Sequence, residues 1–420
     1  MKIVKRIYDG CAFLLTKVIF PIVLLLILVI GVSELYLRMT SKYFAPLVYT
    51  FNKKVGFVYD HAASPGIVND FGFVDKNRTP SDKHRKRVIL VGDSFVSGTT
   101  LASQLEEDLN RQVPSESFEV IPMGFPGIGL GNMYSFVEEY GIEFNPVAVV
   151  AIFNSSTFAN NSRILESIKL GAHPDHPMRL FFEESNGQCR RIPIDSDYQQ
   201  YLLQELPAKQ TNTIYTKIDQ FLQSTLGRLH LFNWINDIVV SRDRQVFLSR
   251  DNEFAFRYFQ LRSMPQFNKI LSDWYFPRDL DINSMFWVPV DGLPSVFRDA
   301  LNSTKCTLME FEELAKVHNF TFVVAISDDC SIPNTLQRDE FNYRASQMHR
   351  KFAEYGYKDK VVTVARSTNT HYVDLFDSFK NNQDALHEYQ NIHWNDDGIS
   401  LAAFAISKYI ASTLFVQDNQ

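Results

Sequence analysis

Short apolar runs alternate with amphipathic stretches along two long parts of this chain. The runs predict β-strands at residues 87–91, 118–122, 148–153, 320–326 and 372–376. The amphipathic stretches predict helices at about residues 100–111, 130–141, 303–318, 338–356 and 399–415. Because strands that alternate with helices are typical of a parallel sheet covered on both faces, we predict an α/β fold.

Near the N-terminus the pattern is different. Residues 11–33 form an apolar stretch interrupted only by Lys17, and residues 18–32 carry no charge. At about 1.5 Å per residue this stretch is long enough to cross the hydrocarbon layer of a membrane. We therefore expect an uncleaved transmembrane anchor. The alternative is a cleaved signal peptide, for which Gly31-Val-Ser33 offers small residues at a suitable spacing.

The orientation of this anchor follows from its flanks. Lys2, Lys5 and Arg6 favour a cytoplasmic N-terminus, although basic residues also follow the stretch and weaken the asymmetry. No other segment is apolar enough to span a membrane. We expect a single-pass membrane protein whose folded part is extracytoplasmic.

The strand and helix rhythm also breaks at residues 165–300, which are rich in aromatic residues and charged turns. We expect an insertion there, partly helical near residues 215–235, packed beside or over the edge of the sheet that carries the candidate site. The expected organisation is residues 1–40 as cytoplasmic tip and anchor, 41–85 as a juxtamembrane stalk, 86–164 as the first half of the α/β domain, 165–300 as a mixed insertion and 301–420 as the second half.

Composition narrows the function classes. With 420 residues, of which 45% are hydrophobic, the chain can bury one large core or two ordinary ones. A net charge of −6 without a basic patch argues against binding to nucleic acid. The cysteines and histidines show no spacing typical of a metal site, so no metal or other cofactor is expected.

The four cysteines leave the redox state open. Cys11 lies in the expected anchor, and the odd count of Cys189, Cys306 and Cys330 permits at most one bridge among them. Cys306 begins a predicted helix and Cys330 follows the next predicted strand, so both would lie at one edge of the sheet and could pair. The alternative is that all three are reduced.

Residues 87–98, Arg-Val-Ile-Leu-Val-Gly-Asp-Ser-Phe-Val-Ser-Gly, hold a candidate nucleophile. The apolar run stops at Gly92 and is followed by an acid and a serine, so the hydroxyl of Ser94 is presented at the end of a buried strand, where a base could reach it. The alternative is an ordinary turn in which Asp93 or Ser94 caps the next helix.

A candidate base lies near the other end of the chain. Residues 391–400, Asn-Ile-His-Trp-Asn-Asp-Asp-Gly-Ile-Ser, run into the last apolar helical stretch, which places His393 on a loop just before a helix. Asp396 and Asp397 are interpreted as carboxylates that the helix dipole favours at a helix start.

Two further segments complete a pattern. Ile121-Pro-Met-Gly-Phe-Pro-Gly-Ile-Gly129 follows a predicted strand, and Val149-Val-Ala-Ile-Phe-Asn154 is a strand ending in Asn. With Ser94, Gly127, Asn154 and His393 in this order, the chain resembles the SGNH hydrolases of the GDSL superfamily, over roughly residues 55–165 and 285–415. The resemblance implies a flavodoxin-like sheet. The lead-in Asn69-Asp-Phe-Gly-Phe-Val-Asp75 is similar to that of the family's membrane-anchored members.

The resemblance also implies roles. Ser94 would be the nucleophile and His393 the general base. The backbone N–H groups of Ser94 and Gly127 and the side-chain amide of Asn154 would form the oxyanion hole. Two alternatives stay open: Gly127 could merely allow a tight turn, and Asn154 could cap the following helix.

One departure from the family pattern affects the base. Members of this type usually carry an Asp two or three residues before the histidine, whereas this chain has Asn391 and Gln390 there. An amide oxygen can orient an imidazole but brings no charge, and in a serine triad the Asp-to-Asn change lowers turnover on the order of ten-thousand-fold. We expect Asn391 to orient His393. The alternatives are the Gln390 amide, a backbone carbonyl, and an acid borrowed from Asp377, at the end of the last predicted strand.

The predicted function is therefore ester hydrolysis on O-acyl groups, expected to be O-acetyl groups of carbohydrate, through an acyl-enzyme on Ser94. The first alternative is an O-acyltransferase that modifies a surface polysaccharide, because similar anchored proteins carry a His-Trp pair resembling His393-Trp394; it would need a membrane partner that donates the acyl group. The second is a non-catalytic polysaccharide-binding protein. The expected partners are an acylated carbohydrate or other O-acyl ester and, through residues 11–33, the lipid bilayer.

Overall fold

The structure is a computed structural model that describes residues 49–62, 64–80, 84–163, 177–195, 197, 295–327, 356–379, 386–387 and 393–415, with a few single residues between 17 and 32. The chain divides into two compact units, residues 1–48 with 206–250 and residues 49–205 with 251–420. Nearly all described residues belong to the second unit.

A parallel sheet of five strands forms the centre of this second unit. The strands are β3 (Lys86–Gly92), β4 (Phe118–Gly124), β5 (Ala148–Phe153), β8 (Thr321–Ile326) and β9 (His371–Asp374). Their spatial order is β4-β3-β5-β8-β9, and every neighbouring pair is parallel. Counted along the chain this is the order 2-1-3-4-5 of flavodoxin-like doubly wound sheets. The predicted α/β fold with a parallel sheet is confirmed.

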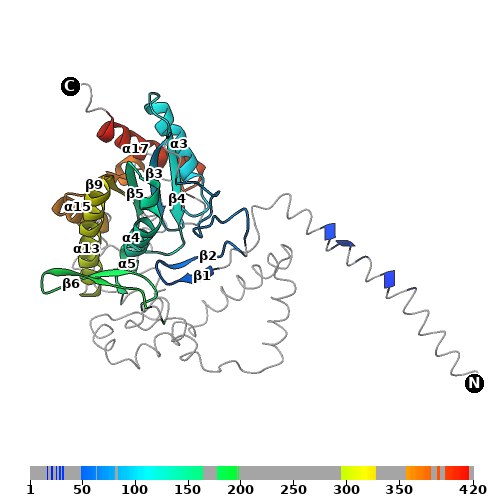
Figure 1. Ribbon diagram of the computed structural model, residues 1–420, viewed down its shortest axis with the longest axis horizontal. Coiled ribbons are helices and arrows are strands. Elements are labelled where there is room, and N and C mark those ends of the chain that lie inside the picture. Colours follow the sequence, from blue (N-terminus) through cyan, green and yellow to red (C-terminus); the bar gives the residue numbers. More distant parts are fainter. Residues whose placement is uncertain are drawn as a thin grey trace, which may run out of the picture. The chain divides into compact units, whose positions relative to one another are not determined.

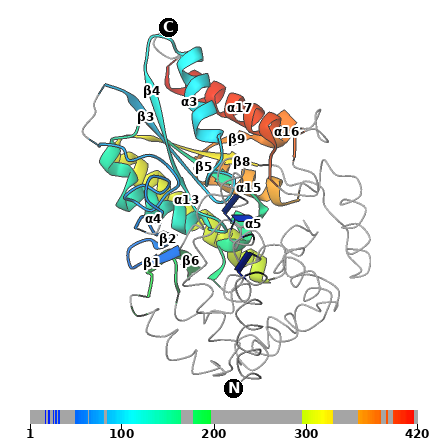
Figure 2. The ribbon, with the colours of Figure 1, turned by 90° about the vertical axis from the view of Figure 1, so that its right-hand side faces the viewer.

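Helices cover both faces of the sheet (Figure 1, Figure 2). α3 (Leu101–Gln112) and α17 (Asp396–Leu414) pack together on one face, while α4 (Leu130–Glu139) and α13 (Ser295–His318) pack on the other. The shorter helices are α5 (Ser155–Asn160), α15 (Gly356–Ser367), α16 (Leu375–Phe379) and the 3-10 helix η2 (Gly141–Phe144).

β3 illustrates why these residues form a central strand. Val88 and Leu90 are fully buried in the cluster that includes α3 and α17, whereas Ile89 lies beside Gly141, on the face of α4. Successive side chains of a strand point to opposite faces, so a strand covered on both sides has to be a continuous apolar run. Burying each such side chain contributes about 1.5–3 kcal/mol.

One predicted helix and the end of one predicted strand need correction, and another predicted helix lies almost wholly outside the described residues. α13 begins at Ser295, not at residue 303, and β9 ends at Asp374, so Asp377 lies in α16 rather than at the end of a strand. The helix expected at residues 338–356 lies outside the described residues except for its last residue, where α15 begins. As expected, Asp396 and Asp397 stand in the first turn of α17, which Asn395 caps by accepting from the Gly398 N–H.

Residues 49–80, assigned to a stalk from the sequence, pack against the α/β domain. β1 (Tyr49–Asn52) and β2 (Gly56–Tyr59) form an antiparallel hairpin, and Val55 and Phe73 are almost completely buried. The Tyr59 hydroxyl is hydrogen-bonded to Ser97 Oγ at 2.9 Å. Turn-forming residues suggested a juxtamembrane stalk, but the apolar side chains between them are buried, which a solvated stalk would not allow.

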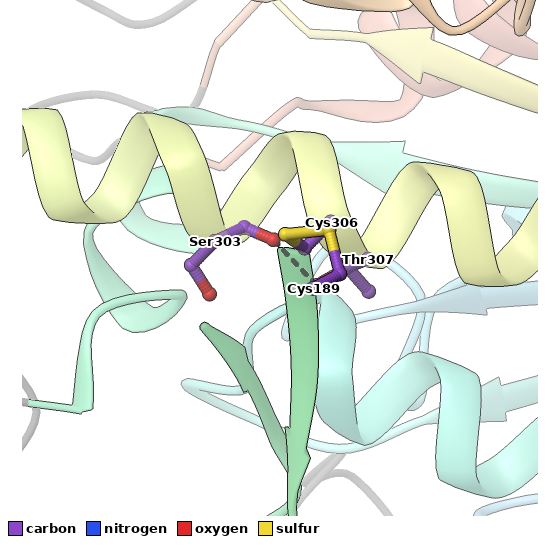
Figure 3. Close-up of a disulfide and its surroundings, with 4 residues drawn as sticks. All are labelled: Cys189, Ser303, Cys306 and Thr307. Atoms are coloured by element: carbon purple, nitrogen blue, oxygen red, sulfur yellow. Dashed lines mark hydrogen bonds between the residues drawn. A yellow bond between two sulfur atoms is a disulfide. The ribbon is translucent and has the colours of Figure 1, made fainter. Parts of the chain in front are cut away.

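Within the expected insertion, the described residues form a second hairpin, β6 (Phe181–Ser185) with β7 (Gln188–Ile192). A disulfide joins Cys189 of this hairpin to Cys306 of α13, with Cα atoms 5.4 Å apart. Figure 3 shows the bridge reaching the middle of the helix, beside Ser303 and Thr307.

The pairing of Cys306 with Cys330 that the sequence allowed is therefore wrong, and so is the alternative that all three cysteines are reduced. Because α13 starts about two turns earlier than expected, Cys306 lies in the middle of the helix and not at the edge of the sheet. Cys330 itself lies outside the described residues, as does the helical segment expected near residues 215–235.

An ion-pair network ties the end of this N-terminal segment to the sheet. Arg78 Nη1 donates to Glu119 Oε1 at 2.7 Å, and Arg87 Nε donates to Glu119 Oε2 at 3.1 Å. Arg78 also pairs with Asp75 at 2.6 Å. All four side chains are largely buried. Removing one of them would therefore leave an oppositely charged group buried without its partner, which is strongly destabilising.

None of the helices in the described part of the chain is both long and apolar enough to cross a membrane. The anchor expected at residues 11–33 lies outside the described residues apart from scattered positions.

Candidate active site

Ser94 sits in the tight turn that follows β3. The carbonyl of Asp93 accepts from the Val96 and Ser97 N–H groups at 3.1 and 3.0 Å, which closes the turn. A Cβ on Gly124, at the end of the neighbouring strand, would meet the Ser97 nitrogen at 2.5 Å. The turn therefore requires close backbone contact between the ends of β3 and β4, and it leaves Ser94 half-buried at the carboxyl edge of the sheet.

His393 reaches this turn from the other end of the chain. Its Nε2 lies 2.7 Å from Ser94 Oγ, across a sequence separation of 299 residues. The imidazole packs 5.1 Å from the ring of Phe95, and the next residue, Trp394, is buried 4.8 Å from the same ring. The Asn395 cap holds the loop at the start of α17. The Ser94–His393 distance falls within the hydrogen-bond range expected of a nucleophile and its base.

The group that orients His393 stays a prediction. Asn391 and Gln390 lie outside the described residues. Asp377 is exposed on α16 and not at the end of β9, so the strand-end position on which its alternative role was argued is wrong.

Asn154 follows β5 and is almost completely buried. Its Oδ1 accepts from the Thr157 N–H at 2.8 Å, which caps α5, and its Nδ2 donates to Asp93 Oδ2 at 2.9 Å. Because the oxygen faces an N–H donor, the nitrogen has to face the nucleophile turn. The helix cap that was an alternative role for Asn154 is thus present, and it directs the amide donor toward the turn of Ser94.

Two backbone donors complete the candidate oxyanion hole. Neither the Ser94 N–H nor the Gly127 N–H has a hydrogen-bond acceptor among the described residues. Gly127 has φ +67°, a conformation that favours glycine, and a Cβ there would meet nothing within 4 Å. The glycine is therefore required by backbone conformation and not by crowding, as the tight-turn alternative expected. That these donors converge on one point beside Ser94 stays a prediction.

Sequence reasoning missed two groups near the site. Arg179 donates from Nη1 to the Gly127 carbonyl at 2.6 Å, and Tyr59 bonds Ser97 as described above. Burial raises the pKa of Tyr59 to about 12, so the phenol is a neutral hydrogen-bond partner. An isolated Arg before a hairpin carries no sequence signal for such a contact. No cluster of residues able to hold a metal ion is found in the described ranges.

Comparison with known proteins gives solved structures only. No family model and no curated protein matches the chain. One similar structure is an acetylxylan esterase from Geobacillus stearothermophilus, with 12% identity, 78% of this chain and 96% of that chain covered, and a TM-score of 0.35. A second is a lipase/acylhydrolase from Enterococcus faecalis, with 10% identity, 77% of this chain and 95% of that chain covered, and a TM-score of 0.33. A third is the acetyl xylan esterase AlAXEase, with 12% identity, 77% of this chain and 99% of that chain covered, and a TM-score of 0.31.

All three are described as esterases or acylhydrolases. With TM-scores below 0.5 and identities near one in ten, this likeness carries no argument about substrate or reaction.

Proposed function

We propose that this chain is an SGNH-type serine ester hydrolase that removes O-acyl groups, expected to be O-acetyl groups, from carbohydrate through an acyl-enzyme on Ser94. The observation that carries the proposal is the 2.7 Å contact between His393 Nε2 and Ser94 Oγ. A serine hydroxyl is a weak nucleophile unless a base stands within hydrogen-bond reach of it, and the two residues come from opposite ends of the domain.

The proposed reaction begins when Ser94 Oγ attacks the acyl carbon and His393 Nε2 takes the hydroxyl proton. The carbonyl electron pair moves to its oxygen, which the N–H groups of Ser94 and Gly127 and the Asn154 amide stabilise. The tetrahedral intermediate then collapses, the bond to the alkoxy oxygen breaks, and His393 returns its proton to that oxygen. Water repeats the sequence on the acyl-enzyme and releases the free acid.

The proposed site lacks a carboxylate next to His393 that would stabilise the positive charge of the imidazolium. With Asn391 and Gln390 preceding His393, we propose that a neutral acceptor, Asn391 first, orients the ring. A neutral acceptor fixes the tautomer but does not stabilise the positive charge, so the enzyme would be slower than one with an Asp.

The proposed location is a single-pass membrane protein, anchored in the bilayer by residues 11–33, with its α/β domain extracytoplasmic. The disulfide between Cys189 and Cys306 supports this, because such bridges form and persist in oxidising compartments.

Acyl transfer to a glycan hydroxyl is a second candidate. It shares the acyl-enzyme, and the pair His393-Trp394 favours it because that pair resembles the one in anchored proteins that acetylate surface polysaccharides. Trp394 is buried against Phe95 and so supports the histidine loop in either reaction. This candidate also needs a membrane partner that supplies the acyl group.

The test uses the full chain in detergent with 4-nitrophenyl acetate, and follows 4-nitrophenol release and the mass of the peptide that carries Ser94. The proposal expects one acetyl group attached to Ser94. Ser94→Ala should lower the rate at least about a thousandfold. Ser103→Ala, which alters an exposed serine on α3, is the matched control and should leave the rate unchanged.

The fate of the adduct separates the candidates. Rapid discharge in buffer means hydrolysis, and discharge only after a glycan is added means transfer. An unmodified Ser94, with the same rate in the wild type and the Ser94→Ala variant, would show that the chain is no serine esterase and would favour a binding role.

A further inference from the structure

The loop between β4 and α4 carries Gly127, and a side chain from the insertion holds it. Arg179 Nη1 donates to the Gly127 carbonyl oxygen at 2.6 Å. The Arg179 side chain comes from the segment just before β6 and is only 6% exposed. A hydrogen bond from a charged donor is roughly twice as strong as a neutral one, and more so where water is excluded.

The backbone around Arg179 is packed too tightly to shift. A Cβ on Gly131, in the first turn of α4, would come within 2.1 Å of the Leu180 carbonyl oxygen. A Cβ on Gly56 would come within 2.7 Å of the Met178 carbonyl oxygen. The residues on either side of Arg179 therefore lie directly against α4 and β2. The backbone that carries the guanidinium is held in place by these contacts.

The residues between Gly127 and the start of α4 are held by the last residue of α5 and by the residue after it. Asn160 Nδ2 donates to the Ile128 carbonyl at 3.3 Å, and Asn161 Oδ1 accepts from the Leu130 N–H at 2.7 Å. These contacts fix the loop after Gly127 but not Gly127 itself. Of the groups in the described residues, Arg179 is the one found to bind the Gly127 carbonyl.

We propose that Arg179 is a positioning residue that holds Gly127 in the conformation in which its N–H serves the oxyanion hole. The inference rests on the proposed function. Glycine occupies φ +67° at no steric cost, but the same freedom lets its flanking peptides rotate away. Holding the carbonyl of Gly127 fixes the peptide that follows this residue. That limits how far the glycine can rotate and so restricts the direction of its N–H, which is the preorganisation that oxyanion stabilisation needs.

The alternative is that Arg179 only stabilises the fold. The two roles differ in what they change. A stabilising contact affects the temperature of unfolding and the amount of folded protein. A positioning contact also changes kcat, because the oxyanion exists only in the transition state, and leaves KM nearly unchanged.

The experiment compares Arg179→Met and Arg179→Gln with the wild type, using the full chain in detergent and 4-nitrophenyl acetate well below the unfolding temperature. Both variants remove the guanidinium, so one that folds is sufficient. We expect kcat to fall about 10- to 100-fold, somewhat less than the loss seen when a whole oxyanion donor is removed, with KM within about twofold. Arg179→Lys, which keeps a charged donor, should recover part of the loss.

A second readout tests the oxyanion hole directly. A fluorophosphonate places its phosphoryl oxygen where the oxyanion forms, so the rate of its reaction with Ser94 should fall by a factor similar to the fall in kcat. Arg191→Met is the matched control, because Arg191 lies on β7 of the hairpin that follows Arg179 but pairs with Glu138. Its kcat should stay within about twofold of the wild-type value.

The outcomes are distinguishable. A wild-type chain that neither hydrolyses the ester nor is labelled at Ser94 overturns the proposed function, and this inference with it. A labelled wild type whose folded Arg179 variants keep kcat and the labelling rate, or lose no more than Arg191→Met, overturns the inference alone.

Discussion

Asn154 Nδ2 donates to the carboxylate of Asp93 at 2.9 Å, so the candidate oxyanion donor is tied to the residue that precedes the nucleophile. Asp93 is itself buried, and its other oxygen accepts from the Phe95 N–H at 3.1 Å. The carboxylate thus joins the end of β3 to the end of β5. A single buried acid fixes both the turn that presents Ser94 and the amide that faces it.

This arrangement gives Asn154 two roles that mutation can separate. Asn154→Ser keeps a side-chain oxygen that caps α5 but removes the amide donor. We expect kcat for an activated ester to fall about 100- to 1,000-fold, as for the loss of one oxyanion donor. The free energy of unfolding, measured by denaturant titration, should fall by about 1.5–3 kcal/mol, because the buried Asp93 carboxylate loses a hydrogen-bond donor while the helix cap is kept.

The paired variant is Asn154→Ala, which removes both roles. Its kcat should match that of Asn154→Ser, while its free energy of unfolding should fall by a further 0.5–2 kcal/mol or so for the lost cap. A serine variant with wild-type kcat would mean that Asn154 only caps the helix.

The second prediction concerns the bridge between Cys189 and Cys306, which closes a chain separation of 117 residues. Replacing both cysteines by serine should lower the free energy of unfolding by about 2–4 kcal/mol, because the unfolded chain gains freedom. Tryptophan fluorescence during guanidinium titration measures this, and reductant should destabilise the wild type by a similar amount.

Cys330→Ser is the control for this bridge and should leave stability unchanged. A peptide map under non-reducing conditions provides an independent check of the pairing. Recovery of a peptide that joins Cys306 to Cys330 would contradict the bridge to the hairpin.

Local sequence signals were sufficient for the turn and the histidine loop. The apolar run of β3 ends at Gly92, where the strand ends, and Asn395 is the cap that starts α17. Both depend on residues adjacent in sequence, since a strand end and a helix cap are set by backbone hydrogen bonding within a few positions. Placing Ser94 opposite His393 depended on the order of the four motifs, since His393 stands on the loop before α17 and not at the end of a strand.

Contacts between distant segments could not be predicted in this way. The pairing of Cys189 with Cys306 depends on α13 starting at Ser295, earlier than its apolar pattern indicates, and on a hairpin that no pattern placed beside it. The contact of Arg179 with Gly127 joins residues 52 positions apart and depends on one side-chain conformation. Neither the periodicity of apolar residues nor the spacing of motif residues along the chain predicts such contacts.

The third prediction concerns acid stability. Burial alone would raise the pKa of Glu119, but the hydrogen bonds from Arg87 and Arg78 outweigh it and lower that pKa below its ordinary value. A carboxyl whose pKa is lower in the folded state contributes stability above its unfolded pKa of about 4.3, and that contribution is lost as the pH falls toward the folded value. Unfolding titrations from pH 7 downward should show this loss.

Glu119→Gln should remove that part of the pH dependence and lower the free energy of unfolding at pH 7 by about 3 kcal/mol, because two buried guanidinium groups lose a shared anion. Glu313→Gln, which alters an exposed pair with Lys316, is the control and should change stability by less than about 1 kcal/mol. An unchanged acid profile in Glu119→Gln would show that the network does not set it.

The last prediction concerns the acceptor for His393, which determines how active the proposed enzyme can be. An imidazole that is free to rotate or to change tautomer is a poor base, and the chain offers an amide at Asn391 where similar proteins carry a carboxylate. We expect Asn391→Asp to raise kcat for an activated ester, because a carboxylate at that position would stabilise the imidazolium as well as orient the ring. Asp377→Asn is the matched test of a borrowed acid and should change kcat by less than about twofold, since Asp377 is exposed on α16. Loss of activity in Asp377→Asn with no gain in Asn391→Asp would show instead that the acid is borrowed and that the neutral acceptor is wrong.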